Sequence, residues 1–122
     1  AIDKLVELGI TDNDRVGEFG QSFGGYTVSA LVGQTDRFRA AAAIAGATDI
    51  ATNYGAFDPA ARGWPFIEQD MAVNGPIYES GLGFKVDPAT DPALYHRNSP
   101  LTFADRIHTP LLLIHGELDT RA

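Results

Sequence analysis

The chain has 122 residues, no cysteine and a formal net charge of −7 at neutral pH. This acidic balance argues against anionic partners, so we expect no nucleic-acid binding and no attraction to an acidic membrane surface. Without cysteine there can be no disulfide and no thiolate metal site, and no apolar run approaches the ~20 residues that cross a bilayer. A hydrophobic fraction of 44% is ordinary for a globular protein and allows a core.

The first part of the chain predicts helix, strand, helix and strand in succession. Residues 2–8 place apolar side chains on one helical face, with Gly9 as a stop, and residues 11–14 form a polar connection. Residues 15–19 then predict a short strand, and residues 26–32 a helix that ends at Gly33.

Residues 38–45 contain an alanine run that can be interpreted in two ways. Alanine favours helix by intrinsic propensity. The position after a strand–helix pair favours a buried strand of small residues instead, because alternating strands and helices build a parallel sheet. We therefore predict a strand here.

The second half is less regular. Small and turn-forming residues predict an irregular excursion over 46–64, a short helix over 66–73 and a second loop over 74–93. Ser99-Pro100 predicts the start of another helix, with serine as N-cap and proline at the first helical position, ending before Thr109-Pro110.

The last part of the chain completes an α/β pattern of central parallel strands with flanking helices. Residues 111–115 form an apolar run that suits a central parallel strand. Residues 116–119 then turn out of the sheet at its carboxyl edge, where α/β proteins bind their ligands.

The most informative motif is Gly20-Gln21-Ser22-Phe23-Gly24. A G-x-S-x-G sequence between a strand and a helix is typical of the nucleophile of an α/β-hydrolase, whose serine lies at the apex of a sharp, strained turn. The flanking glycines are expected to keep strand and helix from colliding. The following helix would point backbone N–H groups at the place where an oxyanion forms.

A nucleophilic serine needs a base, and the base needs a carboxylate that orients it. The α/β-hydrolase chain order is serine, acid, histidine, and Ser22 and Asp119 fit the first two places. His96, His108 and His115 all precede Asp119 and fit the third place poorly, so we interpret them as structural or surface residues. No two histidines have the spacing of a helical metal site, and no metal is predicted.

The motif around Ser22 also allows other interpretations. The glycines around Ser22 form neither G-x-G-x-x-G nor a Gly-Lys-Ser/Thr phosphate loop, so nucleotide binding is disfavoured and no cofactor is predicted. Alternatively, Ser22 could have a purely structural role in a tight turn and not act as a nucleophile. Trp64, Tyr54 and Phe66 could line a pocket, although aromatic residues beside an irregular loop more often pack its base.

Beyond these motifs, the chain resembles the prolyl oligopeptidase family of serine peptidases. The matching stretches extend over most of the sequence: Asp14-Arg15-Val16-Gly17, Gly20-Gln21-Ser22-Phe23-Gly24-Gly25-Tyr26, Asp36-Arg37-Phe38-Arg39-Ala40-Ala41, Asn98-Ser99-Pro100-Leu101, Ala104-Asp105-Arg106-Ile107, Thr109-Pro110-Leu111-Leu112 and Ile114-His115-Gly116-Glu117-Leu118-Asp119. The branch with acylaminoacyl-peptidases and dipeptidyl-peptidases is the most similar. Glu18 departs from the pattern, because the family commonly has an apolar residue there.

The resemblance implies a serine peptidase that acts on short peptides through an acyl-enzyme on Ser22, with Asp119 as triad acid. It also implies that the backbone N–H of Phe23 is one oxyanion donor, and that Phe23 and Tyr26 shape the substrate-binding wall. Two alternatives remain open: an esterase of the same fold, and a catalytically dead hydrolase-fold binding module.

The resemblance further implies that residues 1–122 are an internal fragment of a catalytic domain with a partial α/β-hydrolase fold. The triad histidine, the second oxyanion donor and a β-propeller would belong to the rest of the parent chain. The fragment alone is therefore expected to be inactive and prone to association.

Overall fold

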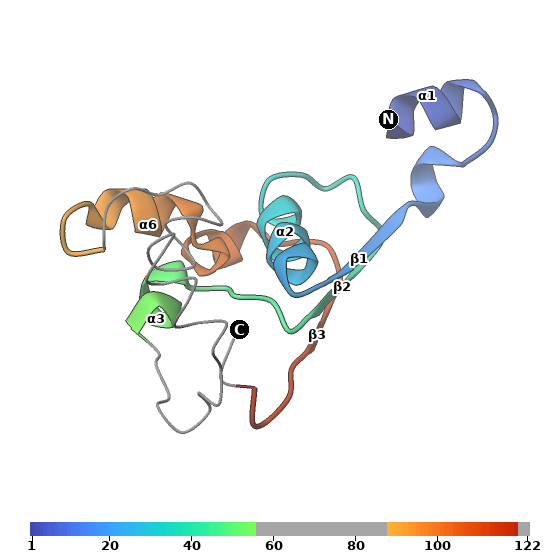
Figure 1. The fold of residues 1–122 in the computed structure, drawn as a ribbon. Coiled ribbons are helices and arrows are strands. Elements are labelled where there is room, and N and C mark those ends of the chain that lie inside the picture. Colours follow the sequence, from blue (N-terminus) through green and yellow to red (C-terminus); the bar gives the residue numbers. More distant parts are fainter. Residues whose placement is uncertain (56–87, 120–122) are drawn as a thin grey trace, which may run out of the picture.

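The computed structural model describes residues 1–55 and 88–119, with the backbone alone for 53–55. Its centre is a three-stranded parallel sheet in the order β1-β2-β3 (Figure 1). The strands are β1 (Gly17–Gln21), β2 (Ala40–Ile44) and β3 (Leu111–Ile114). In this register Ala41 lies opposite Glu18 on one side and Leu111 on the other. The sheet confirms the α/β prediction and the strand predicted for the alanine run.

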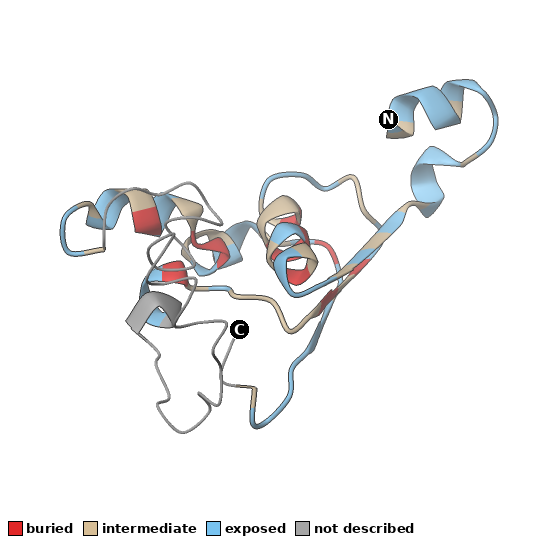
Figure 2. Cartoon of the chain, in the orientation of Figure 1, coloured by how far each residue is buried: buried red, intermediate tan, exposed pale blue. Residues whose placement is uncertain are grey.

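One face of the sheet is covered by α2 (Phe23–Val32), which connects β1 to β2 (Figure 1). Val28 and Val32 of this helix are buried against Ala41 and Ala43 of β2. Buried residues accordingly lie on α2 and on β2 beneath it, and a second buried cluster, with Ile50 and Tyr95, lies outside these two elements (Figure 2). The alanine run forms a strand because its small side chains let the helix approach closely, and this packing outweighs helix propensity.

The opposite face of the sheet is apolar and exposed within the described part of the chain. Phe19 is 83% exposed, Leu112 58% and Ile114 46%. These side chains alternate with those that face α2, as the two-residue period of a strand requires. An apolar face of this kind usually packs against another layer.

Among the described helices, none is long and apolar enough to cross a membrane.

The chain enters β1 two residues later than the sequence predicts. Helix α1 (Ile2–Glu7) stands beyond the amino end of β1, and the 3-10 helix η1 (Asn13–Arg15) occupies the expected first strand residue (Figure 1). The Asp12 carboxylate caps η1 by accepting the Asp14 N–H at 2.9 Å.

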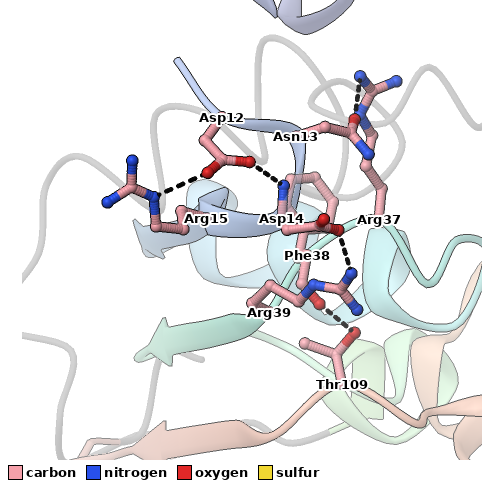
Figure 3. Close-up of polar contacts among 8 residues, drawn as sticks. All are labelled: Asp12, Asn13, Asp14, Arg15, Arg37, Phe38, Arg39 and Thr109. Atoms are coloured by element: carbon pink, nitrogen blue, oxygen red, sulfur yellow. Dashed lines mark hydrogen bonds and ion pairs between the residues drawn. The ribbon is translucent and has the colours of Figure 1, made fainter.

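Exposed ion pairs lie in the segment that precedes β1 and connect it to the start of β2 (Figure 3). Arg15 Nε lies 3.0 Å from Asp12 Oδ2, and Arg39 pairs with Asp14. Thr109 donates to the Phe38 carbonyl at 3.1 Å and so ties the amino ends of β2 and β3 together. The ion pairs are solvent-exposed, so each contributes little stability.

Two helices lie where loops are expected. Helix α3 (Ile50–Gly55) falls within the excursion predicted over 46–64, and α6 (Pro92–Asn98) starts inside the loop predicted over 74–93. Both have aspartate caps: Asp49 accepts the N–H of Ala51, and Asp91 accepts that of Leu94. The prediction was wrong because a short aspartate-capped helix gives little hydrophobic periodicity. The helix predicted over 66–73 lies outside the described residues.

The helix predicted after Ser99 is a kinked 3-10 helix, η3 (Pro100–Arg106), and Ser99 does not cap it with its side chain. Ser99 is buried, and its hydroxyl oxygen instead accepts the Ile50 N–H at 3.0 Å and donates to the Tyr95 carbonyl at 2.9 Å. Ser99 therefore stands at the N-cap position of η3 as predicted, but its side chain joins α3 to α6 and does not cap the helix.

Candidate active site

Ser22 occupies the single position between β1 and α2, with φ 58° and ψ −120°. Non-glycine residues seldom adopt this left-handed conformation, and it persists only where surrounding contacts impose it. Two backbone hydrogen bonds do so here: Ser22 N–H donates to Ile44 O at 2.9 Å, and Tyr26 N–H donates to Ser22 O at 3.1 Å. The Ser22 side chain is exposed and does not cap α2, so its hydroxyl is not committed to the helix.

The two glycines around Ser22 differ in whether a side chain would fit in their place. A Cβ on Gly20 would lie 2.4 Å from the Gly24 oxygen, whereas a Cβ on Gly24 would meet nothing within 4 Å. The expectation for Gly20 is confirmed, and the one for Gly24 is wrong, because a Gly24 side chain would point away from the strand. The close approach of strand and helix needs only one of the two glycines.

A second close approach, which the motif did not reveal, joins α2 to the end of β2. A Cβ on Gly25 would lie 2.6 Å from Ile44 O, and a Cβ on Gly46 would lie 2.4 Å from the Gly25 carbonyl carbon. Ala45, which lies between Ile44 and Gly46 in the sequence, also has a positive φ of 47°. The pairing of Gly25 with Gly46 could not be found from spacing, since 21 residues separate them (46 − 25).

Phe23 and Tyr26 lie on the first turn of α2 beside Ser22. Their ring centroids are 5.4 Å apart, and the Phe23 side chain is exposed. Tyr26 is half-buried against Ile50 and Tyr95, and its hydroxyl donates to the Asn98 carbonyl at 3.0 Å. Burial raises the pKa of the Tyr26 phenol, so it is a neutral donor near pH 7.

Asp119 follows β3 at the same edge of the sheet as Ser22, with β2 between them. Its backbone N–H donates to Gly116 O at 3.0 Å and closes the turn that leaves the strand. His115 Nε2 lies 3.9 Å from Asp119 Oδ2, which is longer than a hydrogen bond. Ser22 and Asp119 thus share the carboxyl edge that the α/β pattern predicts.

Within the described residues, no hydrogen bond joins Ser22 to any of the three histidines. His108 precedes β3 and lies at the amino end of the sheet, opposite Ser22. His96 is exposed on α6. His115 is exposed beside Asp119. Of the proposed pocket aromatics, Trp64, Phe66 and the Tyr54 side chain lie outside the described residues.

Glu18 lies on the α2 side of β1, opposite Ala41. Its Oε1 atom is buried and has no hydrogen-bond partner within the described residues. Loss of solvent raises the pKa of the Glu18 carboxyl above its ordinary value. A strand position covered by a helix favours an apolar residue, and a carboxylate there is destabilising.

A profile described as the prolyl oligopeptidase family matches residues 1–122. Over 99% of its length the chain is 35% identical to dipeptidyl-peptidase 5 of Porphyromonas gingivalis, covering 16% of that protein. It is 32% identical to an acylamino-acid-releasing enzyme of Arabidopsis thaliana, again over 99% of the chain and 15% of the relative. The chain therefore spans about one sixth of the length of these relatives.

The solved structures that match the chain are peptidases, as the sequence relatives are. The uncomplexed acylaminoacyl peptidase of Pyrococcus horikoshii matches 98% of the chain with a TM-score of 0.74 and 26% identity, over 17% of its own chain. A puromycin-hydrolyzing peptidase of Mycobacterium tuberculosis matches 93% of the chain with a TM-score of 0.67 and 31% identity, over 15% of its own chain.

Proposed function

The chain belongs to the prolyl oligopeptidase family, and from that premise we propose that it is part of a longer serine peptidase that cleaves short peptides through an acyl-enzyme on Ser22. The observation that carries this proposal is the backbone of Ser22, with φ 58° at the junction of β1 and α2. Strain of this kind at an exposed serine is costly, and its use as a nucleophile explains why it is kept.

In the proposed reaction the Ser22 oxygen attacks the carbonyl carbon of the scissile bond while a histidine accepts the hydroxyl proton. The carbonyl oxygen becomes an oxyanion that accepts a hydrogen bond from the Phe23 N–H at the start of α2. Collapse of the tetrahedral intermediate breaks the C–N bond, and the histidine returns its proton to the leaving amine. Water then repeats the cycle on the acyl-enzyme and releases Ser22.

The base is proposed to come from outside residues 1–122, at a position after Asp119 in the chain order of this fold. Asp119 would hold that imidazole in one tautomer and stabilise its protonated form. The position of Asp119 at the carboxyl edge, with a side chain that is only partly buried, supports this role. His115 lies beside the acid, but it precedes Asp119 by four residues and so does not fit the chain order.

The substrate class is argued from the surface beside Ser22 and from the relatives. The exposed Phe23 ring offers an apolar contact next to the nucleophile, and Tyr26 lies behind it. The relatives carry the names dipeptidyl-peptidase and acylamino-acid-releasing enzyme, which favour short peptide substrates over folded proteins.

The test is hydrolysis by the full-length protein that carries this chain. Dipeptide and N-acyl-amino-acid p-nitroanilides are compared with the corresponding p-nitrophenyl esters, for the wild type and for Ser22→Ala. We expect amide hydrolysis that Ser22→Ala abolishes. Ester hydrolysis without amide hydrolysis would favour the esterase, and loss of neither activity in Ser22→Ala would reject Ser22 as the nucleophile.

A further inference from the structure

Tyr26 makes two hydrogen bonds that connect Ser22 to a distant part of the chain. Its backbone N–H donates to Ser22 O at 3.1 Å, and its hydroxyl donates to Asn98 O at 3.0 Å. The first bond is local and closes the first turn of α2. The second joins positions 72 residues apart.

The local bond matters because of the peptide group that it orients. Ser22 C=O and Phe23 N–H belong to the same planar peptide unit, and its two polar groups point in opposite directions. A donor that fixes the direction of the Ser22 oxygen therefore fixes the direction of the Phe23 N–H. That N–H is the oxyanion donor of the proposed reaction.

The distant bond gives Tyr26 a rigid support. Asn98 is the last residue of α6, where carbonyl groups lack a partner within the helix. Neighbouring carbonyls at this helix end are also satisfied: Leu94 O accepts the Asn98 side chain, and Tyr95 O accepts the Ser99 hydroxyl. The phenol thus binds the end of a helix whose other carbonyls already take part in side-chain hydrogen bonds.

The rings add a third connection. Tyr26 packs against the cluster of Ile50 and Tyr95. The Phe23 ring contacts the Tyr26 ring, with 5.4 Å between the ring centroids. Phe23 is 59% exposed, so this ring contact restricts a side chain that is otherwise largely in solvent.

We propose that Tyr26 is a positioning residue for transition-state stabilisation: its hydroxyl anchors the first turn of α2 to the end of α6, and this anchor holds the Ser22–Phe23 peptide with its N–H directed at the oxyanion. The inference rests on the proposed function and extends it. Tyr26 acts through this peptide and through Phe23, without contacting the reacting atoms itself.

The test compares Tyr26→Phe with Thr109→Val in the full-length protein. Each variant removes one hydroxyl that donates to a backbone carbonyl more than 70 residues away, from Tyr26 to Asn98 and from Thr109 to Phe38. The Thr109 bond lies at the amino end of the sheet, away from Ser22. A loss of stability alone should therefore affect both variants in the same way.

For Tyr26→Phe we expect kcat on p-nitroanilides to fall on the order of tenfold while KM changes less than about twofold, because misdirected donors weaken binding of the transition state and not of the ground state. Inhibition by a peptide trifluoromethyl ketone, which forms a tetrahedral adduct on serine, should weaken by the same factor as kcat. Inhibition by the product peptide should not change. Thr109→Val should keep kcat and both inhibition constants, with a similar lowering of the melting temperature.

Equal kcat and equal trifluoromethyl ketone inhibition in Tyr26→Phe and wild type would overturn the inference while leaving the proposed function intact. So would equal losses in Tyr26→Phe and Thr109→Val, since these would mark a general effect of stability. A wild-type protein that hydrolyses no substrate would overturn the proposed function and this inference together.

Discussion

The backbone N–H of Ser22 donates to the carbonyl oxygen of Ile44 over 2.9 Å, so the candidate nucleophile is tied to the last residue of the neighbouring strand. This bond holds Ser22 at φ 58°, in a region that glycine adopts more readily than serine. The conformation that exposes the hydroxyl is therefore imposed by the sheet and costs free energy.

The strain at Ser22 predicts opposite effects on stability and activity. Ser22→Gly should raise the free energy of unfolding by about 1 kcal/mol, because glycine relieves the strained φ at a small entropic cost. Ser22→Ala keeps a Cβ and should give no such gain. Both variants should be inactive, and melting temperatures of the full-length proteins separate them. A gain in Ser22→Ala equal to that in Ser22→Gly would contradict the strain.

Gly20 and Gly24 form a matched pair for the packing of β1 against α2. Gly20→Ala should cost about 3 kcal/mol or more, because its Cβ would lie 2.4 Å from backbone atoms that cannot move aside. Gly24→Ala should be neutral or stabilising by up to about 1 kcal/mol, because its Cβ has open space and alanine favours helix. Soluble yield and melting temperature are the measurements. Similar losses of stability in both variants would contradict the finding that β1 and α2 approach closely at Gly20 and not at Gly24.

The Glu18 carboxyl predicts a pH dependence of stability. Its pKa is raised by burial, so the folded protein binds this proton more tightly than the unfolded chain does. The contribution of Glu18 to stability therefore falls as the pH rises from the ordinary value of 4.5 through the raised folded pKa, and it stays low at neutral pH.

Glu18→Gln should consequently melt above wild type at pH 7 and lose this advantage near pH 4. Glu18→Val should gain more at pH 7, about 1 kcal/mol, because it also removes the unpaired buried oxygen and favours a strand. Glu117→Gln is the matched control, because it makes the same change at an exposed position. A Glu18→Gln variant that melts below wild type at pH 7 would indicate a partner for this carboxylate in the rest of the protein.

Asp119 should be needed for turnover and not for folding. Asp119→Asn keeps the shape of the side chain but cannot stabilise an imidazolium, so kcat should fall by about 10³- to 10⁴-fold with little change in melting temperature. Glu117→Gln, in the same exposed turn, should keep full activity. If Asp119→Asn retained wild-type kcat, another carboxylate would have to be the triad acid.

The exposed sheet face predicts how residues 1–122 behave when produced alone. Phe19, Leu112 and Ile114 leave an uncovered apolar surface on a parallel sheet, and such surfaces associate. The isolated chain should bind a hydrophobic dye and sediment as aggregates or oligomers. A monomer with a sharp cooperative melt would contradict the proposal that it is an internal part of a larger domain.

The sequence predicted the features that depend on local pattern. The strand before Ser22, the helix after it and the apolar strand predicted over 111–115 were found from hydrophobic runs and one glycine-flanked serine, and the last strand ends one residue earlier, at Ile114. The strand over the alanine run was found only from its place in the βαβ order, because alanine propensity points to a helix.

Other features depend on contacts that no local pattern encodes. The Gly25–Gly46 approach and the Tyr26–Asn98 hydrogen bond join distant segments, and they were not predicted. Ser99 has the sequence of a helix N-cap, yet its hydroxyl bonds to Ile50 and Tyr95 because tertiary packing places them within reach. Helices α3 and α6 were missed because their signals are single aspartate caps at Asp49 and Asp91.

The central claim is that Ser22 is the nucleophile of a serine hydrolase, and covalent labelling tests it most directly. The full-length protein is treated with a fluorophosphonate, its intact mass is measured, and the adduct is located by peptide mapping. The account predicts one adduct, on Ser22, that is lost in Ser22→Ala and slowed in Asp119→Asn. A folded full-length protein with no adduct on Ser22 would contradict it and would point to a binding module that kept the fold without the chemistry.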